Sequence, residues 1–241
     1  MKFYNRTIVV SMAVFVFGFA ALCLATAIGR SPVLHKLIGK HDLYIPQAYT
    51  RDAGFGLKGA SIFDGFITTH YPGDAPLPAG GPDPDGKWSL KRIRIEFKDL
   101  DQIEEPYRHT APQNLLNDRL KLSKAYQVDG EQYGLIHQEQ PENPNKIHKI
   151  HNEFWIERKD GALVSFIECD VDAPYPSCNQ FFRDDKFSYQ VFFYKIYLPE
   201  WSHIRANVFA LMSSFRSEET ALAYLAEKNS KTKTEEGDKK P

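Results

Sequence analysis

An uncharged run from Thr7 to Gly29 is the feature that most constrains this chain. The run is 23 residues long and is bracketed by Arg6 and Arg30. A helix rises about 1.5 Å per residue and the hydrocarbon core of a bilayer is about 30 Å thick, so about 20 apolar residues are enough to span it. The run therefore predicts a transmembrane helix, and we assign residues 1–30 as an N-terminal membrane anchor.

A cleaved signal peptide is the alternative for this run. Ala25-Thr26-Ala27 has the small-x-small pattern of a cleavage site, and cleavage after Ala27 would leave a soluble periplasmic protein. A lipid anchor on Cys23 is not expected, because the preceding residue is Leu22 and a lipoprotein signal needs a small residue there. We therefore predict a single-pass peptide anchor in the bacterial inner membrane.

Cys169 and Cys178 are the two cysteines outside this run, and we predict that they form a disulfide. The eight residues between them include two prolines, which favours a compact loop whose ends approach each other. Two free thiols in a cytosolic protein are the alternative, and a metal site is disfavoured because no second cysteine pair is present. Disulfides persist in oxidising compartments, whereas the basic residues flanking the anchor are too evenly divided to orient it. The cysteines thus favour a periplasmic C-terminal domain.

The composition of the remaining chain is that of one ordinary globular domain. Without residues 1–30 the chain has 27 basic and 31 acidic residues, a net charge of about −4. No basic stripe is present, so we expect no nucleic-acid partner. We predict a connector over residues 31–41, a single domain over residues 42–228 and a disordered tail over residues 229–241.

Strand patterns dominate the predicted domain. Apolar and charged residues alternate over Leu90–Lys98, which is the period of a strand with one buried and one wet face. Asp129-Gly130 and Asp160-Gly161 each separate two strand-like runs, and both are predicted to form tight hairpin turns because Asp-Gly tolerates positive φ.

The C-terminal third predicts a central strand followed by helices. In the middle of Phe187–Leu198, residues at both odd and even positions are apolar, which indicates a strand covered on both faces. After Pro199, apolar residues recur at helical spacing from Trp201 to Phe215, and a second helix is expected over Glu218–Lys228. The predicted fold class is α+β, with an antiparallel sheet and C-terminal helices packed on it.

A long loop over Tyr71–Trp88 interrupts the strand pattern. It contains five prolines and four glycines, which exclude regular structure over most of its length. Long ordered loops are often functional, so Asp83, Asp85 and Trp88 are candidate partner-binding residues; a simple surface excursion is the alternative. The start of this acidic segment is similar to a calcium loop but has no closing Glu, so no metal is expected.

Sequence motifs for catalysis are absent. His148 and His151 have no intervening metalloprotease Glu, and the chain has no nucleophile elbow, P-loop or dinucleotide fingerprint. The carboxylates near Asp99 and Asp101 are predicted to lie in a solvated turn before Pro106. We therefore expect no catalytic residue, no cofactor and no enzymatic activity.

Several segments resemble a known class of bacterial proteins. They are Tyr44-Ile45-Pro46-Gln47-Ala48-Tyr49, the two downstream cysteines, the aromatic strand through Tyr189 and Tyr194, and Leu198-Pro199-Glu200-Trp201 leading to Phe215. Together they look like small periplasmic proteins that are encoded beside type VI secretion effectors in Gram-negative bacteria and act as immunity factors. The resemblance implies a binding protein whose partner is a secreted toxin. A bitopic structural or assembly component of an envelope complex is the alternative, followed by an envelope enzyme.

Overall fold

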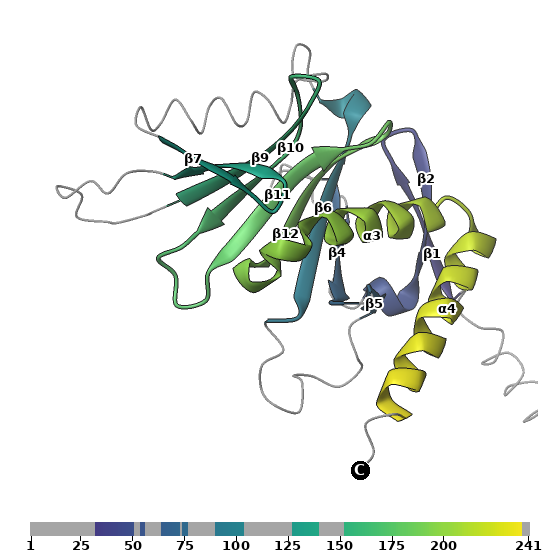
Figure 1. Ribbon diagram of the computed structural model, residues 1–241. Coiled ribbons are helices and arrows are strands. Elements are labelled where there is room, and N and C mark those ends of the chain that lie inside the picture. Colours follow the sequence, from purple (N-terminus) through teal and green to yellow (C-terminus); the bar gives the residue numbers. More distant parts are fainter. Residues whose placement is uncertain are drawn as a thin grey trace, which may run out of the picture. The chain divides into compact units, whose positions relative to one another are not determined.

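The computed structural model describes residues 32–50, 54–55, 64–72, 74–76, 90–103, 127–139 and 152–237 (Figure 1). The chain divides into two compact units, residues 1–32 and Val33–Pro241, and the elements below belong to the second unit. The predicted anchor over residues 7–29 lies outside the described residues. Within the described residues, no helix has both the length and the apolar character needed to cross a membrane.

A large antiparallel sheet forms the centre of the domain. The strands are β1 (Val33–Ile38), β2 (His41–Pro46), β3 (Gly54–Phe55), β4 (Gly65–His70), β5 (Ala75–Pro76), β6 (Arg92–Asp99), β7 (Gln127–Gln132), β8 (Leu135–Glu139), β9 (Asn152–Lys159), β10 (Ala162–Asp170), β11 (Ser177–Arg183) and β12 (Phe187–Tyr194). Ten of them form one sheet in the order β3-β4-β6-β12-β11-β10-β9-β8-β7, with β5 paired to β4. Strands β1 and β2 form a separate antiparallel hairpin.

Strands β6 and β12 pair with each other in the middle of the large sheet. The predicted alternation in β6 is confirmed, since Ile93, Ile95 and Phe97 are buried and the residues between them are partly exposed. Strand β12 is central, as expected, but it ends at Tyr194 and its burial also alternates. The expectation that both of its faces are covered was wrong, because the residues that point to the second face, such as Phe192, remain partly exposed.

Two tight turns test the hairpin predictions. Asp160 and Gly161 join β9 to β10 with φ values of +52° and +80°, so this predicted hairpin is confirmed. The prediction for Asp129-Gly130 was wrong, because β7 continues through it with a register shift. The chain reverses instead at Tyr133-Gly134, where φ is +56° and +75°. Positive φ at both central positions is the requirement of a type I′ turn, and here tyrosine takes the first of them.

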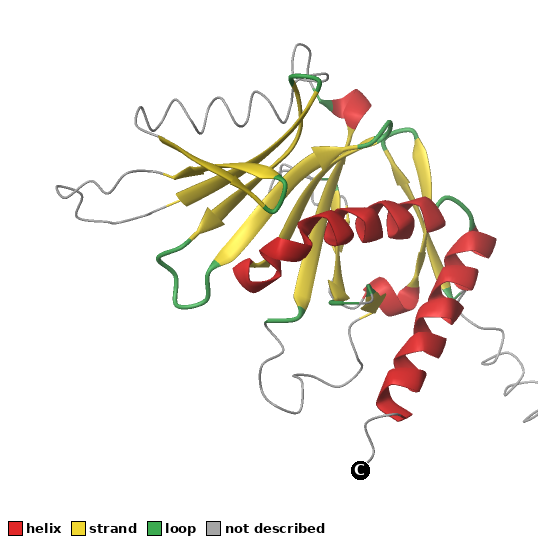
Figure 2. Cartoon of the chain, viewed as in Figure 1, coloured by secondary structure: helices red, strands yellow, loops and turns green. Residues whose placement is uncertain are grey.

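One face of the sheet is covered by the C-terminal helices (Figure 2). A short 3₁₀ helix, η3 (Lys195–Glu200), leads into α3 (Trp201–Ser214), which runs across the sheet (Figure 1). The predicted apolar stripe of α3 is confirmed, and its buried members share one hydrophobic core with the sheet. These are Trp201, Ile204, Val208 and Leu211, with Phe215 at the end of the helix. We call this side of the sheet the covered face; Ile67, Ile95 and Val191 lie on it.

Helix α4 (Glu218–Gly237) follows α3 and packs against β1, β2 and β5. We expected the helix to end at Lys228, with a disordered tail after it, but the helix continues to Gly237. Residues 229–236 contain no glycine or proline, so the first strong helix breaker is Gly237 itself. Two further 3₁₀ segments, η1 (Gln47–Thr50) and η2 (Leu100–Gln102), follow β2 and β6.

The predicted connector over residues 31–41 also needs correction. Residues Val33–Ile38 form β1, and the Gly39-Lys40 turn joins β1 to β2. Gly39 has φ +59° and Lys40 does not have positive φ, which is the pattern of a type II′ turn with glycine first. The hairpin was overlooked because the residues of β1 have no strict alternation of apolar and polar side chains.

Candidate protein-binding surface

The face of the sheet opposite the covered face is chemically divided. On β9, β10 and β11 it presents Phe154, Ile156, Phe166 and Phe181, which form a second buried hydrophobic cluster. On β4, β6 and β12 it presents partly exposed polar and aromatic side chains. We call this second group the polar face; it consists of Phe66, Arg92, Arg94, Glu96, Lys98, Gln190, Phe192 and Tyr194.

Arg94 lies at the centre of the polar face. Its guanidinium carbon is 4.0 Å from the centre of the Phe66 ring, and its Nε is 2.8 Å from a carboxylate oxygen of Glu96. A cation over an aromatic ring and an adjacent carboxylate both restrict the guanidinium, while 40% of the side chain stays exposed. Arg94 is therefore held in place and still able to contact a partner.

A second arginine increases the positive charge at this position. Arg92 is two residues before Arg94 on β6 and projects on the same side of the sheet. Burial, together with the neighbouring Arg94 cation, lowers the pKa of Arg92. Guanidinium groups nevertheless remain charged at neutral pH. The polar face thus carries at least two cations close together.

Strand β12 contributes the aromatic part of the polar face. The rings of Phe192 and Tyr194 are 5.6 Å apart at an angle of 77°, an edge-to-face arrangement. Next to them, the side-chain amide of Gln190 donates a hydrogen bond of 2.9 Å to Asn179 on β11. Arginine and tyrosine are the residue types most often found at the energetic centres of protein interfaces. This composition suits recognition of another protein.

The disulfide lies on the covered face, at the base of the loop that joins β10 to β11. Cys169 and Cys178 are directly opposite each other in the two strands, and their predicted bond is confirmed. Both residues are fully buried. The bond therefore fixes the two strands where the loop of residues 171–176 begins and ends.

A group of titratable residues lies at the edge of the covered face. The His137 ring stacks on Trp155 with centroids 4.0 Å apart, and its Nε2 is 4.0 Å from a carboxylate oxygen of Glu153. The same carboxylate forms an ion pair with Lys195 of η3. Since Lys195 compensates the charge of Glu153, this group joins η3 to β9. Nearby, Arg205 of α3 pairs with Glu157, with one N–O distance of 3.1 Å.

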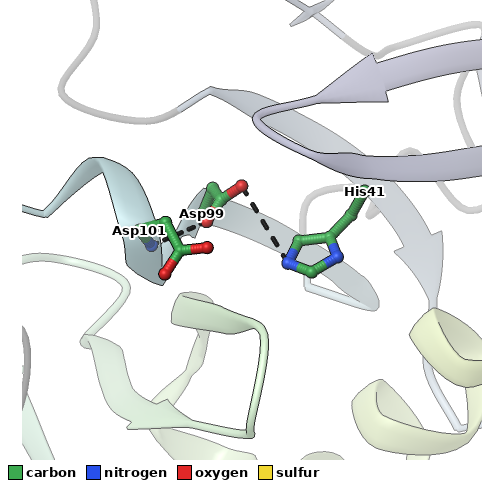
Figure 3. Close-up of side chains that lie close together, drawn as sticks. All are labelled: His41, Asp99 and Asp101. Carbon is green, nitrogen blue, oxygen red and sulfur yellow. Dashed lines mark hydrogen bonds and ion pairs between the residues drawn. The ribbon is translucent and has the colours of Figure 1, made fainter.

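His41, Asp99 and Asp101 form a further cluster, shown in Figure 3, in which one ligand atom of each lies within 4.8 Å of the others. Asp99 is fully buried, which corrects the prediction of a solvated turn. Its carboxylate accepts hydrogen bonds from the backbone N–H groups of Lys40, at 3.1 Å, and Asp101, at 2.7 Å. The Lys40 ammonium pairs with the Asp101 carboxylate. These contacts attach the β1–β2 turn to the end of β6.

Asp74 fixes α4 to the rest of the domain. It is buried, its carboxylate lies 3.6 Å from the ammonium of Lys228, and its backbone carbonyl accepts a 2.9 Å hydrogen bond from the Tyr49 hydroxyl. Burial raises the pKa of Asp74 to about 6, although Lys228 acts in the opposite direction. The lysine therefore offsets only part of the cost of placing this carboxylate away from water.

The partner-binding residues predicted from the sequence, Asp83, Asp85 and Trp88, lie outside the described residues, and so do His148 and His151. The alternation in the sequence did predict the solvent-exposed face of β6, but it did not predict that Phe66 and Phe192 lie beside that face. Those neighbours depend on the pairing of β4 and β12 with β6. Strand order was therefore the missing information.

Comparison with known proteins finds a solved structure with a similar fold. No protein-family model matches the chain, and no curated protein matches it by sequence. Among solved structures, the chain is similar to Smlt3025, described as an immunity protein of the Stenotrophomonas maltophilia type IV secretion system. The TM-score is 0.58 at 15% sequence identity, and the match covers 78% of this chain and 94% of that one. The chain thus shares its fold with an immunity protein.

Proposed function

We propose that this chain is an immunity protein that binds a secreted effector and blocks its toxicity. The observation that carries the proposal is the fold likeness to Smlt3025, which extends over nearly the whole of that protein. The sequence resemblance to immunity factors favours the same class on separate grounds. Since the related structure is an immunity protein, we infer that this chain acts by binding rather than by catalysis.

The polar face is the surface that we assign to the effector. Arg94 is positioned by Phe66 and Glu96, so little conformational entropy is lost when it meets a partner. Phe192 and Tyr194 add apolar area beside it on a rigid strand. An effector surface that is acidic opposite Arg94 and apolar opposite the aromatic pair would be complementary to this face.

We further propose that residues 7–29 anchor the protein in the inner membrane and that the sheet domain lies in the periplasm. The Cys169–Cys178 disulfide supports this placement, because such bonds persist in oxidising compartments. A soluble periplasmic protein cleaved after Ala27 is the alternative. The sequence resemblance favours an effector of a type VI system, whereas the related structure comes from a type IV system.

Co-purification from native membranes tests the proposal. The tagged full-length chain is extracted in detergent, and proteins that are retained with it are identified by mass spectrometry. We expect a secreted toxin, and expression of that toxin in the periplasm should kill cells that lack the chain and spare cells that contain it. Recovery of envelope assembly proteins without a toxin, or no protection, would contradict the proposal and favour the structural alternative.

Arg94→Ala tests the assigned surface. We expect a loss of effector affinity of about tenfold or more, as is typical of a central interface arginine. Arg216→Ala is the matched control, because its side chain is 45% exposed against 40% for Arg94 and it lies between α3 and α4. If both variants bind the effector with the affinity of the wild type, the polar face is not the contact surface.

A further inference from the structure

The loop of residues 171–176, which we call the hairpin tip, presents an exposed aromatic side chain. Tyr175 is 66% exposed, and Ile196 in η3 is 65% exposed. In the described part of the chain these are two of four large apolar side chains with such exposure; the others are Leu37 and Tyr133. Single exposed apolar residues need no explanation, whereas apolar side chains that gather in one region can mark an interaction site.

Tyr175 and Ile196 are placed near each other by a backbone hydrogen bond. The Lys195 N–H donates to the Pro176 carbonyl at 2.9 Å. Each exposed residue is the direct sequence neighbour of one partner in this bond. The hairpin tip and η3 also lie at the same end of the sheet in Figure 1. The two residues therefore lie near each other along the backbone at this end of the sheet.

Several constraints hold the hairpin tip in one conformation. The disulfide joins the strands at its base, and the Asp172 N–H donates a 3.1 Å hydrogen bond to the Asp170 side chain. Pro174 and Pro176 flank Tyr175 and restrict the backbone on both sides of it. A loop that is rigid before binding loses little entropy when it enters an interface, and an aromatic anchor on it then contributes more to affinity.

The hairpin tip is continuous with the polar face. Ser177, the first residue of β11, pairs with Tyr194 at the end of β12. From there β12 leads directly through Lys195 to Ile196. The hairpin tip and η3 thus adjoin the end of β12 that carries Phe192 and Tyr194.

The charges around the tip indicate which partner it fits. Asp170 and Asp172 are partly or fully exposed, whereas the nearby Lys195 ammonium forms an ion pair with Glu153. Asp170 and Asp172 therefore place two carboxylates at the base of the hairpin tip. An apolar depression with a basic rim would complement them.

We propose that Tyr175 and Ile196 anchor the effector interface by entering an apolar, basic-rimmed depression on the effector. This inference rests on the proposed function and adds a second contact element beside the polar face. Its geometry is that of a rigid aromatic finger beside the polar face. Removal of either side chain should then accelerate dissociation, because anchors of this kind act mainly on the off-rate.

Affinity measurements with the full-length chain and the co-purified effector test this assignment. Tyr175→Ala and Ile196→Ala should each weaken binding by roughly tenfold to several hundredfold. Leu37→Ala is the matched control, since Leu37 is 64% exposed but lies on β1, and its affinity should equal that of the wild type. Asp172→Lys should slow association at low salt.

The outcomes separate this inference from the function on which it rests. If the wild type binds the effector and both tip variants bind equally well, the hairpin tip is not the anchor and the proposed function stands. If the wild type does not bind any effector, both proposals fall. Thermal unfolding of each variant provides the folding check, and a midpoint equal to that of the wild type shows that a lost affinity is local.

Discussion

Replacing Gly39 with alanine tests how the β1–β2 turn is attached to the large sheet. Gly39 has φ +59°, and a Cβ at this position would overlap the Asp99 carboxylate. That carboxylate is fully buried and accepts the backbone N–H of Lys40 at 3.1 Å. The alanine variant must therefore accept a left-handed backbone and also displace a buried charge from its hydrogen bond.

The two costs can be added from the structure. Left-handed backbone at alanine costs about 1 to 2 kcal/mol. Loss of a hydrogen bond to a buried carboxylate costs a further 1.5 to 3 kcal/mol, roughly. We expect Gly39→Ala to lower the free energy of unfolding by about 2.5 to 5 kcal/mol. Gly134→Ala is the matched control, because Gly134 has φ +75° with no atom within 4 Å of the added Cβ, so only the backbone cost applies.

Equilibrium unfolding in urea, followed by tryptophan fluorescence, measures both variants. The expected difference between them is about 1.5 to 3 kcal/mol, which is the part that belongs to Asp99. In an Asp99→Ala background this difference should shrink, since the overlap with the carboxylate is gone and only the contact with the Cβ of residue 99, at 2.9 Å, remains. Equal destabilisation by Gly39→Ala and Gly134→Ala in the wild-type background would show that the contact with Asp99 contributes nothing.

Three further changes have defined outcomes. Burial raises the pKa of Asp74 to about 6, so the folded chain retains a proton that the unfolded chain releases, and the free energy of unfolding should fall by roughly 2 to 3 kcal/mol as the pH rises from about 4 to about 7. Urea titrations at several pH values should show this slope in the wild type and in Asp160→Asn but not in Asp74→Asn. Replacing Cys169 and Cys178 with alanine should cost about 2 to 3 kcal/mol, because the bond closes a loop with a sequence separation of 9 residues; an unchanged urea midpoint would contradict this. Leu211→Ala, in the last turn of α3, should cost about 2 to 5 kcal/mol in the same assay, and a cost below about 1 kcal/mol would mean that α3 contributes little to the core at this position.

Local patterns in the sequence predicted the local features of the fold. The alternation of Ile93, Ile95 and Phe97 was sufficient to place β6 and its buried side, because strand periodicity needs no distant partner. The helical stripe that begins at Trp201 was sufficient for α3 in the same way. Asp160-Gly161 was correct as a turn because both flanking runs are long enough to pair across it.

The features that were not predicted depend on distant parts of the chain. Asp99 looked solvated because its hydrogen-bond partner Lys40 is 59 residues away. Asp129-Gly130 has ideal turn chemistry, yet β7 continues through it and pairs with β8 across the Tyr133-Gly134 turn. The candidate binding surface is of the same kind, since Phe66 lies beside Arg94 only because β4 and β6 pair. Such pairings determine a surface and cannot be derived from any local window of residues.

Side chains alternate between the two faces of the central strands, so the residues that stabilise the fold differ from the residues that can contact a partner. In β12, Val191 and Phe193 point into the core while Phe192 and Tyr194 point to the polar face, so adjacent residues serve different purposes. A side chain on the covered face contributes to the free energy of unfolding, and one on the polar face is free to serve a partner. Substitutions at Val191 should therefore change stability with little effect on the affinity of the folded protein, and substitutions at Tyr194 should do the reverse. The rigid strand that contributes to the core thus also positions the contact residues, which is why a sheet whose central strands are covered on one face is well suited to recognising a protein surface.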